Sequence, residues 1–341
     1  MLSNQTTQAM IFPEKGKVEL VARAVAPLKA SEILVRTTRT LISTGTEGIV
    51  LTGNFAPGTH WHDWVKFPFQ NVGYLHAGRV VDVGADVEKW KIGDRVATRS
   101  PHAGLVVVEA ERALAIAPGV SDEDAAWMGL GKITQVGVRA AQHVLGDTVV
   151  VIGLGLLGQL VVQYARLSGA SEVIAIDTAP RRLEMAASHG ATHTLRVPAG
   201  EAREAVFDLT GGRGADVVCD ITGHPAVFAT ALPLARRFGT VVLLGDAGNP
   251  QLQTLTGDVV TRGLKIVGAH DGHPPDSAQP GVRWSSMEMQ SLFLKYVARG
   301  QIRVSDLITH RFRPEQAPEA YALLQRERET AMGVIFEWNN E

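Results

Sequence analysis

The residues with the clearest chemical meaning are three glycines that follow a run of β-branched residues, Thr148–Ile152. Their G-x-G-x-x-G spacing lets the first glycine make a tight turn, the second admit a pyrophosphate, and the third allow close helix–strand packing. Backbone N–H groups at the start of the helix that follows would bind that anion. The pattern predicts a dinucleotide-binding turn formed by Gly153, Gly155, Leu156, Leu157 and Gly158.

An acidic residue further along the chain indicates which dinucleotide is bound. Asp177 ends a second apolar run, 19 residues after Gly158, where a carboxylate accepts hydrogen bonds from the adenosine ribose hydroxyls. The same carboxylate repels a 2′-phosphate, so the sequence predicts NAD, with NADP less favoured. Arg181 and Arg182 follow closely and soften this preference.

The elements that must position these residues change in character along the chain. Up to about residue 121, short β-rich runs are separated by turn residues, and from about residue 122 helical and strand patterns alternate. Strands that alternate with helices of about ten residues favour a parallel, doubly wound sheet. We therefore expect an α/β protein whose first part is β-rich.

Composition narrows the class of protein. The 341 residues are enough for two domains, and 45% hydrophobic with 20% charged residues is an ordinary globular composition. The net charge of −2 gives no electrostatic reason to expect nucleic acid or a membrane as partner. We see no signal peptide and no apolar run of about 18 residues, so we expect a soluble, cytoplasmic protein. Cys219 is the only cysteine, which excludes an intrachain disulfide and a thiolate-rich zinc cluster.

Segments outside the glycine turn carry a resemblance that runs nearly end to end. They read NVGYLHAGRVVDVG at residues 71–84 and LITHRFRPEQAPEAYALLQ at residues 307–325. With the glycine turn, they make the chain similar to the medium-chain dehydrogenase/reductase superfamily. The resemblance implies a GroES-like β-rich catalytic domain, residues 1–125 and 272–341, and a Rossmann NAD-binding domain, residues 126–271. It also implies cofactor contacts, near the nicotinamide, from Thr134, Thr222, Gly223, Gly245 and Gly268.

Zinc-dependent members of that superfamily hold the metal with a cysteine, a His-Glu pair and a further ligand. In this sequence the resemblance places Tyr74 and Leu75 at the His-Glu pair, Ser43 or Thr44 at the cysteine, and Leu130 near the last ligand. A hydroxyl, a phenol and aliphatic side chains do not make a zinc site. The resemblance therefore implies an enzyme without zinc.

Two histidine-containing loops are weaker candidates for a metal site. His60 and His62 lie in one loop, and His270 and His273 lie in the other. Neither pattern supplies a third fixed ligand, so we expect these histidines to face solvent or substrate. The sequence thus predicts no metal site.

Organic groups at and near the zinc-ligand positions would replace the metal. Tyr74 offers a phenolic O–H, and Lys132 offers an ammonium that would stabilise an alkoxide. The STGTEG segment is similar to the S-x-G-T-E motif of a zinc-free branch, and its Glu47 would orient a donor or bind a substrate hydroxyl. His102 and His270 are candidate relay residues. Each of these side chains could instead have only a structural role, such as filling volume, carrying a solvated charge on a helix or supporting a loop.

Three functions fit these features. The favoured one is a zinc-independent, NAD-dependent dehydrogenase that acts on a secondary alcohol of a sugar, cyclitol or related polyol. A reductase of quinones or enones would prefer NADPH, which Asp177 disfavours. A non-catalytic NAD-binding sensor fits the loss of metal ligands, but not their replacement by polar groups. The resemblance further implies a homodimer paired through an edge strand near residues 264–270.

Overall fold

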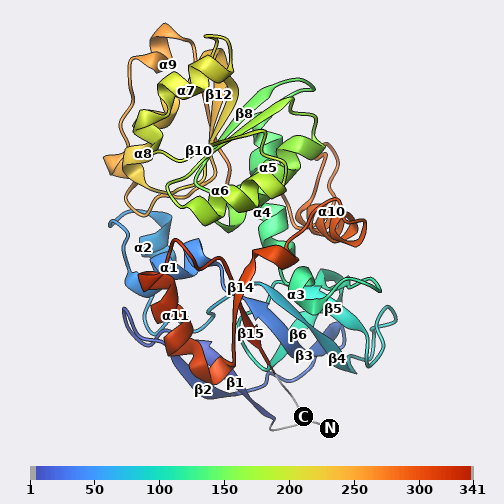
Figure 1. The fold of residues 1–341 in the computed structure, drawn as a ribbon. Helices are drawn as coiled ribbons and strands as arrows, with labels where there is room; N and C mark the ends of the chain where they lie inside the picture. The colour runs from blue at the N-terminus through green and yellow to red at the C-terminus, as the bar shows by residue number, and fades with distance from the viewer. Residues whose placement is uncertain (1–4, 339–341) are drawn as a thin grey trace. The chain divides into compact units, whose positions relative to one another are not determined.

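The computed structural model describes residues 5–338 of the chain, which form two compact units (Figure 1). Residues 272–289, which the resemblance assigns to the catalytic domain, belong here to the same unit as the glycine turn. Unit 1 contains residues 5–54, 60–130 and 290–338, and unit 2 contains residues 55–59 and 131–289.

Unit 2 is built on a six-stranded parallel sheet with the strand order β10-β9-β8-β11-β12-β13. From β8 the chain continues outward to β9 and β10, then returns to the other side of β8 with β11. This reversal is the switch point at which doubly wound sheets bind ligands, and the predicted α/β Rossmann class is confirmed. The strands are β8 (Thr148–Ile152), β9 (Glu172–Ile176), β10 (His193–Leu195), β11 (Ala215–Asp220), β12 (Ala235–Leu243) and β13 (Lys265–Gly268).

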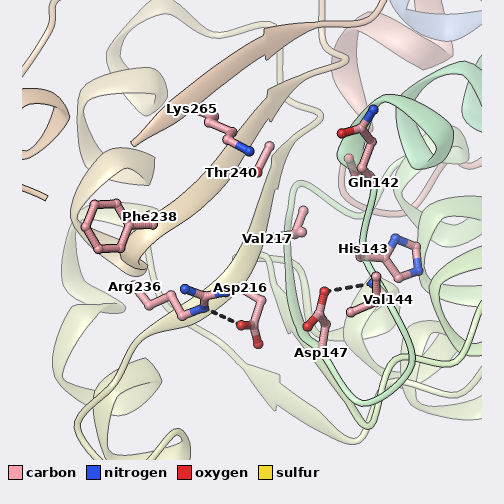
Figure 2. A pocket seen from close by; sticks show the side chains of 11 residues that line it. Gln142, His143, Val144, Asp147, Asp216, Val217, Arg236, Phe238, Thr240 and Lys265 are labelled. Carbon is pink, nitrogen blue, oxygen red and sulfur yellow. Dashed lines mark hydrogen bonds and ion pairs between the residues drawn. The ribbon is translucent and has the colours of Figure 1, made fainter. Parts of the chain in front are cut away.

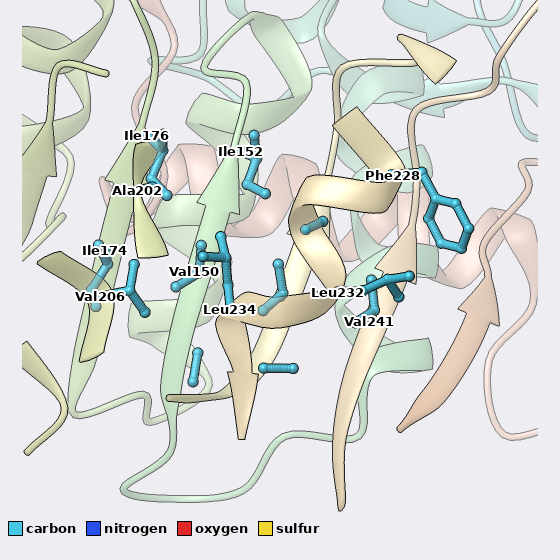
Figure 3. Packing of buried hydrophobic residues seen from close by; sticks show 14 of the residues in the cluster. Val150, Ile152, Ile174, Ile176, Ala202, Val206, Phe228, Leu232, Leu234 and Val241 are labelled. Carbon is cyan, nitrogen blue, oxygen red and sulfur yellow. The ribbon is translucent and has the colours of Figure 1, made fainter. Parts of the chain in front are cut away.

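Helices cover this parallel sheet, and buried side chains fill the space between the layers (Figure 3). Val150 and Ile152 lie two residues apart in β8, so both point to the same face of the sheet. On that face they belong to one buried cluster with Val206 and Phe228 from the covering helices. The helices of unit 2 are α5 (Leu156–Leu167), α6 (Pro180–Ser188), α7 (Arg203–Leu209), α8 (Pro225–Ala231) and α9 (Asp258–Thr261), with short 3-10 turns η2 (Ala199–Glu201), η3 (Leu232–Leu234) and η4 (Pro250–Leu252).

Unit 1 is the β-rich part. Its seven-stranded sheet has the order β14-β15-β3-β4-β5-β7, with β6 also paired to β3, and β1 and β2 form a separate antiparallel pair. The long strand β3 organises the sheet because it pairs with β4, β6 and β15. The strands are β1 (Thr6–Ile11), β2 (Glu19–Ala24), β3 (Glu32–Leu41), β4 (His76–Val83), β5 (Arg95–Thr98), β6 (Leu105–Glu109), β7 (Leu114–Ala115), β14 (Ile308–Phe312) and β15 (Gly333–Glu337).

The helices of unit 1 are short, and two longer helices contain the unit boundaries. The boundaries fall within α4 (Met128–Ala141) and at the start of α10 (Ser286–Ala298). No helix of the described residues is both long and apolar enough to cross a membrane. The remaining helices are α1 (Thr44–Thr52), α2 (His60–Trp64), α3 (Asp122–Ala125) and α11 (Ala317–Arg326), with 3-10 turns η1 (Ala110–Arg112), η5 (Ser305–Leu307) and η6 (Pro314–Gln316).

Candidate functional site

The glycine turn lies between β8 and α5, at the carboxyl end of the central strand of unit 2. Gly153 has a φ of 88°, in the left-handed region that favours glycine. A Cβ at Gly158 would lie 2.0 Å from the Gly153 carbonyl oxygen, so helix and turn touch without room for a side chain. A Cβ at Gly155 would meet no heavy atom of the described chain within 4 Å. Internal packing therefore explains two of the glycines, and the open space at Gly155 fits the approach of a pyrophosphate.

The start of α5 provides the donors for that anion. Gly155 is the N-cap and makes no side-chain cap hydrogen bond, so the first N–H groups of the helix need an outside partner. These are the N–H groups of the turn that begins at Leu156 and Leu157, and the helix dipole favours negative charge there. The predicted cradle residues thus lie together at one helix end.

Asp177 follows β9, next to the glycine turn. Its Oδ2 accepts a hydrogen bond from the Leu154 N–H at 2.7 Å, and its Oδ1 accepts one from the Ala179 N–H at 2.9 Å. Arg182 Nη1 lies 3.7 Å from Asp177 Oδ2. The carboxylate is thus fixed against the turn, where ribose-binding acids are found, and the adjacent arginine partly offsets its charge.

The end of β11 meets the glycine turn, and the end of β12 meets the segment that follows β11. Thr222 directly faces it, because a Cβ at Gly153 would lie 2.8 Å from Thr222 Cγ2. Gly245 lies against Gly223, where an added Cβ would be 2.3 Å from the Gly223 nitrogen. The turns predicted to contact the cofactor are therefore adjacent in unit 2.

Asp220, which the sequence analysis did not identify, holds Thr222 in place at the carboxyl end of β11. Its Oδ1 accepts hydrogen bonds from the Thr222 N–H at 2.9 Å and the Thr222 hydroxyl at 2.7 Å. Burial raises the pKa of Asp220 above its ordinary value. An acid at the end of a β-branched run was the signal that could have identified it, as it did for Asp177.

The other predicted residues of unit 2 lie on α4 and after β13. Thr134 is fully buried on α4, and Gly268 ends β13. Lys132 is 2% exposed, and its Nζ donates to Asp271 Oδ1 at 2.7 Å. His270 is exposed, and its Nδ1 accepts a hydrogen bond from the Gly272 N–H at 3.1 Å. Asp271 is thus a partner of Lys132 that sequence reasoning did not assign.

A polar pocket of about 200 Å³ lies at the amino ends of the parallel strands, opposite the glycine turn (Figure 2). Asp147, Asp216 and Lys265 line it, and they lie at the amino ends of β8, β11 and β13. Doubly wound sheets bind dinucleotides at the carboxyl ends of their strands. The pocket is therefore distinct from the predicted cofactor cradle.

In unit 1 the positions that resemble zinc ligands converge. Ser43 Oγ lies 2.6 Å from Tyr74 Oη. A Cβ at Gly129, next to Leu130, would lie 2.5 Å from Leu75 Cδ2 and 3.6 Å from Tyr74 Cδ2. Zinc prefers thiolate, imidazole and carboxylate ligands, and the side chains at these positions supply none. The donor set here does not fit zinc.

Glu47 is surrounded by donors inside unit 1. It is 3% exposed, and its Oε1 accepts the Ser43 N–H at 2.7 Å. Its Oε2 accepts hydrogen bonds from the Tyr321 hydroxyl and from His102 Nε2, the latter at 3.1 Å. Burial, followed by the charge of Glu47, raises the pKa of Tyr321 well above its ordinary value. Glu47 therefore orients Ser43, and Tyr321 is a partner that lies too far along the sequence to be predicted.

Two buried histidines support the Tyr74 segment. His102 is fully buried, and a Cβ at Gly73, whose φ is 85°, would lie 2.5 Å from its ring. His76 accepts a hydrogen bond at Nδ1 from Thr98 at 2.8 Å and donates from Nε2 to Thr37 at 3.0 Å, because Thr37 itself donates to a carbonyl. Burial and the nearby His102 lower the pKa of His76 to about 3. His76 is thus a neutral, structural histidine.

Cys219 lies inside the parallel sheet. It is 3% exposed, and burial raises the pKa of its thiol to about 12. The thiol is therefore inert as a nucleophile or metal ligand.

Known proteins resemble this chain in sequence and in fold. The family described as zinc-binding dehydrogenase matches residues 157–286. A D-guloside 3-dehydrogenase from Escherichia coli (strain K12) is 28% identical over 280 residues, which cover 80% of this chain and 79% of that protein. A crystal structure from Escherichia coli, described as an oxidoreductase/dehydrogenase of unknown specificity involved in membrane biogenesis, matches with a TM-score of 0.83 and 17% identity, covering 98% and 99% of the two chains.

A second solved structure carries a cofactor. It is a putative zinc-binding dehydrogenase from Sinorhizobium meliloti 1021 bound to NADP, with a TM-score of 0.79 and 23% identity over 98% of this chain and 99% of that one. The structural matches establish the fold. The sequence relatives are dehydrogenases and support an oxidoreductase.

Proposed function

We propose that the protein is an NAD-dependent dehydrogenase that oxidises a secondary alcohol of a sugar, cyclitol or related polyol without zinc. The observation that carries this proposal is the 2.6 Å contact of Ser43 with Tyr74, because hydroxyl groups meet where zinc-dependent members hold their metal. The resemblance to a D-guloside 3-dehydrogenase supports a polyhydroxylated substrate.

The acid–base chemistry is assigned to unit 1 and the cofactor to unit 2. When bound, NAD accepts a hydride at its nicotinamide ring. Tyr74, ionised as a phenolate, takes the proton of the substrate hydroxyl, and the hydrogen-bonded hydroxyl of Ser43 orients its oxygen. Glu47 accepts the Ser43 N–H and so holds the Ser43 backbone, and His102 donates to Glu47. Lys132 supplies a buried positive charge, which Asp271 orients.

The experiment that tests the activity is the absorbance of reduced nicotinamide. NAD is offered with a panel of sugars, cyclitols and secondary alcohols, and NADH or NADPH is offered with quinones and enones. We expect NADH to form from NAD and a polyol. Turnover restricted to NADPH with quinones or enones would identify a reductase instead, and NAD binding without any turnover would favour a sensor.

Asp177 is proposed to set the preference for NAD. Asp177→Asn removes the charge that repels a 2′-phosphate, and we expect the ratio of the NADP to the NAD dissociation constant to fall by about tenfold or more. Calorimetric titration with both dinucleotides measures this ratio. Glu172→Gln, on the half-buried start of β9, is the matched control and should leave it unchanged. An unchanged ratio in Asp177→Asn would assign the preference to other residues.

We propose that two chains form a homodimer through the edge strand β13 of the parallel sheet. Among the strands of residues 5–338, β13 pairs with β12 alone, so its other side presents backbone groups that no described strand pairs. Phe238, Val260 and Ile266, in and beside this edge, are 65%, 86% and 37% exposed. Light scattering should give twice the mass of one chain, and a monomer at micromolar concentration would contradict the proposal. A cytoplasmic location stays a prediction of the sequence.

A further inference from the structure

Arg99 lies over the aromatic ring of Tyr74 in unit 1. Its guanidinium carbon is 4.8 Å from the ring centroid. The register of the sheet brings the two residues together, because His76 in β4 pairs with Thr98 in β5. A hydrogen bond of 2.8 Å between the His76 and Thr98 side chains reinforces that register. The stacking of cation and ring is therefore fixed by a buried part of the sheet.

The oxygen of Tyr74 also has a fixed partner. Ser43 is the N-cap of α1, where a serine hydroxyl normally accepts a hydrogen bond from the first turn of the helix. That bond is missing, and Ser43 Oγ instead lies 2.6 Å from Tyr74 Oη. Glu47 holds the Ser43 N–H at 2.7 Å, so the N-cap backbone is supported in another way. The Ser43 hydroxyl therefore does not cap α1 and instead forms a hydrogen bond with the Tyr74 phenol.

We propose that Arg99 is a positioning residue that favours the phenolate form of Tyr74 and so prepares it to accept a proton. This inference rests on the function proposed above. An arginine stays positively charged at every working pH. A cation over an aromatic ring is held by the negative charge of its π face, and an opposite charge nearby favours an ionised phenol. Arg99 thus supplies positive charge over the ring that carries the reacting oxygen.

The reaction step balances without a change in Arg99. The O–H bond of the substrate breaks, and its proton passes to the Tyr74 oxygen directly or through the Ser43 hydroxyl. The C–H electron pair leaves as a hydride and reduces NAD, while the alcohol carbon is oxidised to a ketone. The proton returns from Tyr74 to water before the next turnover.

The state of Tyr74 is measured by NMR of the full chain labelled with ¹³Cζ-tyrosine. The chain has four tyrosines, and Tyr74→Phe assigns the signal of interest. We expect Arg99→Met to raise the midpoint of the Tyr74 titration by about 1 pH unit. Arg99→Lys, which keeps the positive charge, should restore most of the difference. A midpoint that is the same in Arg99→Met and in the unchanged protein would overturn the proposal.

Lys89→Met is the matched control. Lys89 Nζ lies 4.6 Å from the centroid of the Trp90 ring, so this variant removes another stacked cation from the same unit. It should leave the Tyr74 midpoint unchanged, and an equal change there would show a general charge effect and overturn the proposal. If Arg99→Met does not fold, as judged by circular dichroism, Arg99→Gln compared with Arg99→Lys provides the same test.

Turnover gives the second measurement. We expect kcat to rise with pH as Tyr74 ionises. In Arg99→Met the midpoint of this rise should move to higher pH together with the NMR midpoint, and in Arg99→Lys both midpoints should return towards those of the unchanged protein. A moved NMR midpoint without dehydrogenase activity in any variant would reject the proposed function and leave the ionisation of Tyr74 by Arg99 intact. Activity with an unmoved midpoint would reject the role of Arg99 alone.

Discussion

Tyr74→Phe is expected to lower kcat for alcohol oxidation by about 10² to 10⁴-fold, the usual contribution of a general acid–base group. The substitution removes only the oxygen that contacts Ser43 Oγ at 2.6 Å and keeps the ring beneath Arg99. Folding and the affinity for NAD should therefore stay unchanged. The measurement is steady-state formation of NADH, combined with calorimetric titration of NAD.

The control for this substitution removes a phenol elsewhere. Tyr296→Phe makes the same chemical change at a tyrosine of α10, to which no catalytic role is assigned, and should retain the kcat of the unchanged protein. Equal turnover in Tyr74→Phe and Tyr296→Phe would exclude Tyr74 as the acid–base group. The search would then move to the other predicted catalytic groups, with Lys132 first.

Gly158→Ala and Gly155→Ala each add one methyl group to the same turn, but we expect opposite effects. The first should reduce the stability of the protein, and the second should reduce its affinity for NAD. The Cβ at position 158 would lie 2.0 Å from a backbone carbonyl oxygen that cannot move aside, so we expect a loss of about 3 kcal/mol or more in the free energy of unfolding. The Cβ at position 155 would enter open space, so the stability should be retained. There we expect a large loss of NAD affinity, because the methyl group would occupy the space of the pyrophosphate.

Urea unfolding and NAD titration of both variants separate the two effects. The expected pattern is an unstable Gly158→Ala protein and a stable Gly155→Ala protein that binds NAD weakly. Normal NAD affinity in Gly155→Ala would place the pyrophosphate elsewhere. Normal stability in Gly158→Ala would contradict the close packing of α5 against the turn.

The proximity of the predicted cofactor residues to one another could be inferred because their signals are local. Thr148–Ile152, the three glycines and Asp177 follow one another within 30 residues, and each obeys a rule of strand, turn or helix chemistry. The structure brings them together with the ends of β11 and β12 through the parallel pairing of β8, β9, β11 and β12. The same alternation of strands and helices was enough to predict the fold class.

The contacts of the proposed catalytic residues were less predictable because they join distant parts of the chain. Glu47 meets Tyr321 across 274 residues, and Lys132 meets Asp271 across 139 residues. No periodicity or motif relates such pairs, and only the packed structure shows them. The sequence did not indicate Arg99 for the same reason, since its proposed role depends on the pairing of β4 with β5.

The start of β12 could not be predicted from the sequence pattern. In the segment ATALPLARRFG, residues 229–239, the apolar pattern alone favours a helix, but β12 begins at Ala235, directly after the 3-10 turn Leu232–Leu234. Pro233 ends the helix early because it has no N–H to donate. Phe238 then takes a φ of 60°, which is uncommon for a bulky side chain, and its N–H donates to the Arg262 carbonyl.

The central claim, that this chain transfers hydride without zinc, is tested most directly by measuring metal content and kcat on the same chelator-treated sample. Inductively coupled plasma mass spectrometry gives the zinc content per chain, and NADH formation from NAD and the best substrate of the panel gives kcat. The account predicts that kcat is unchanged when zinc falls far below one atom per chain, and that added zinc does not increase it. Loss of turnover on chelation, with recovery when zinc is restored, would contradict the account and require metal ligands other than Ser43 and Tyr74.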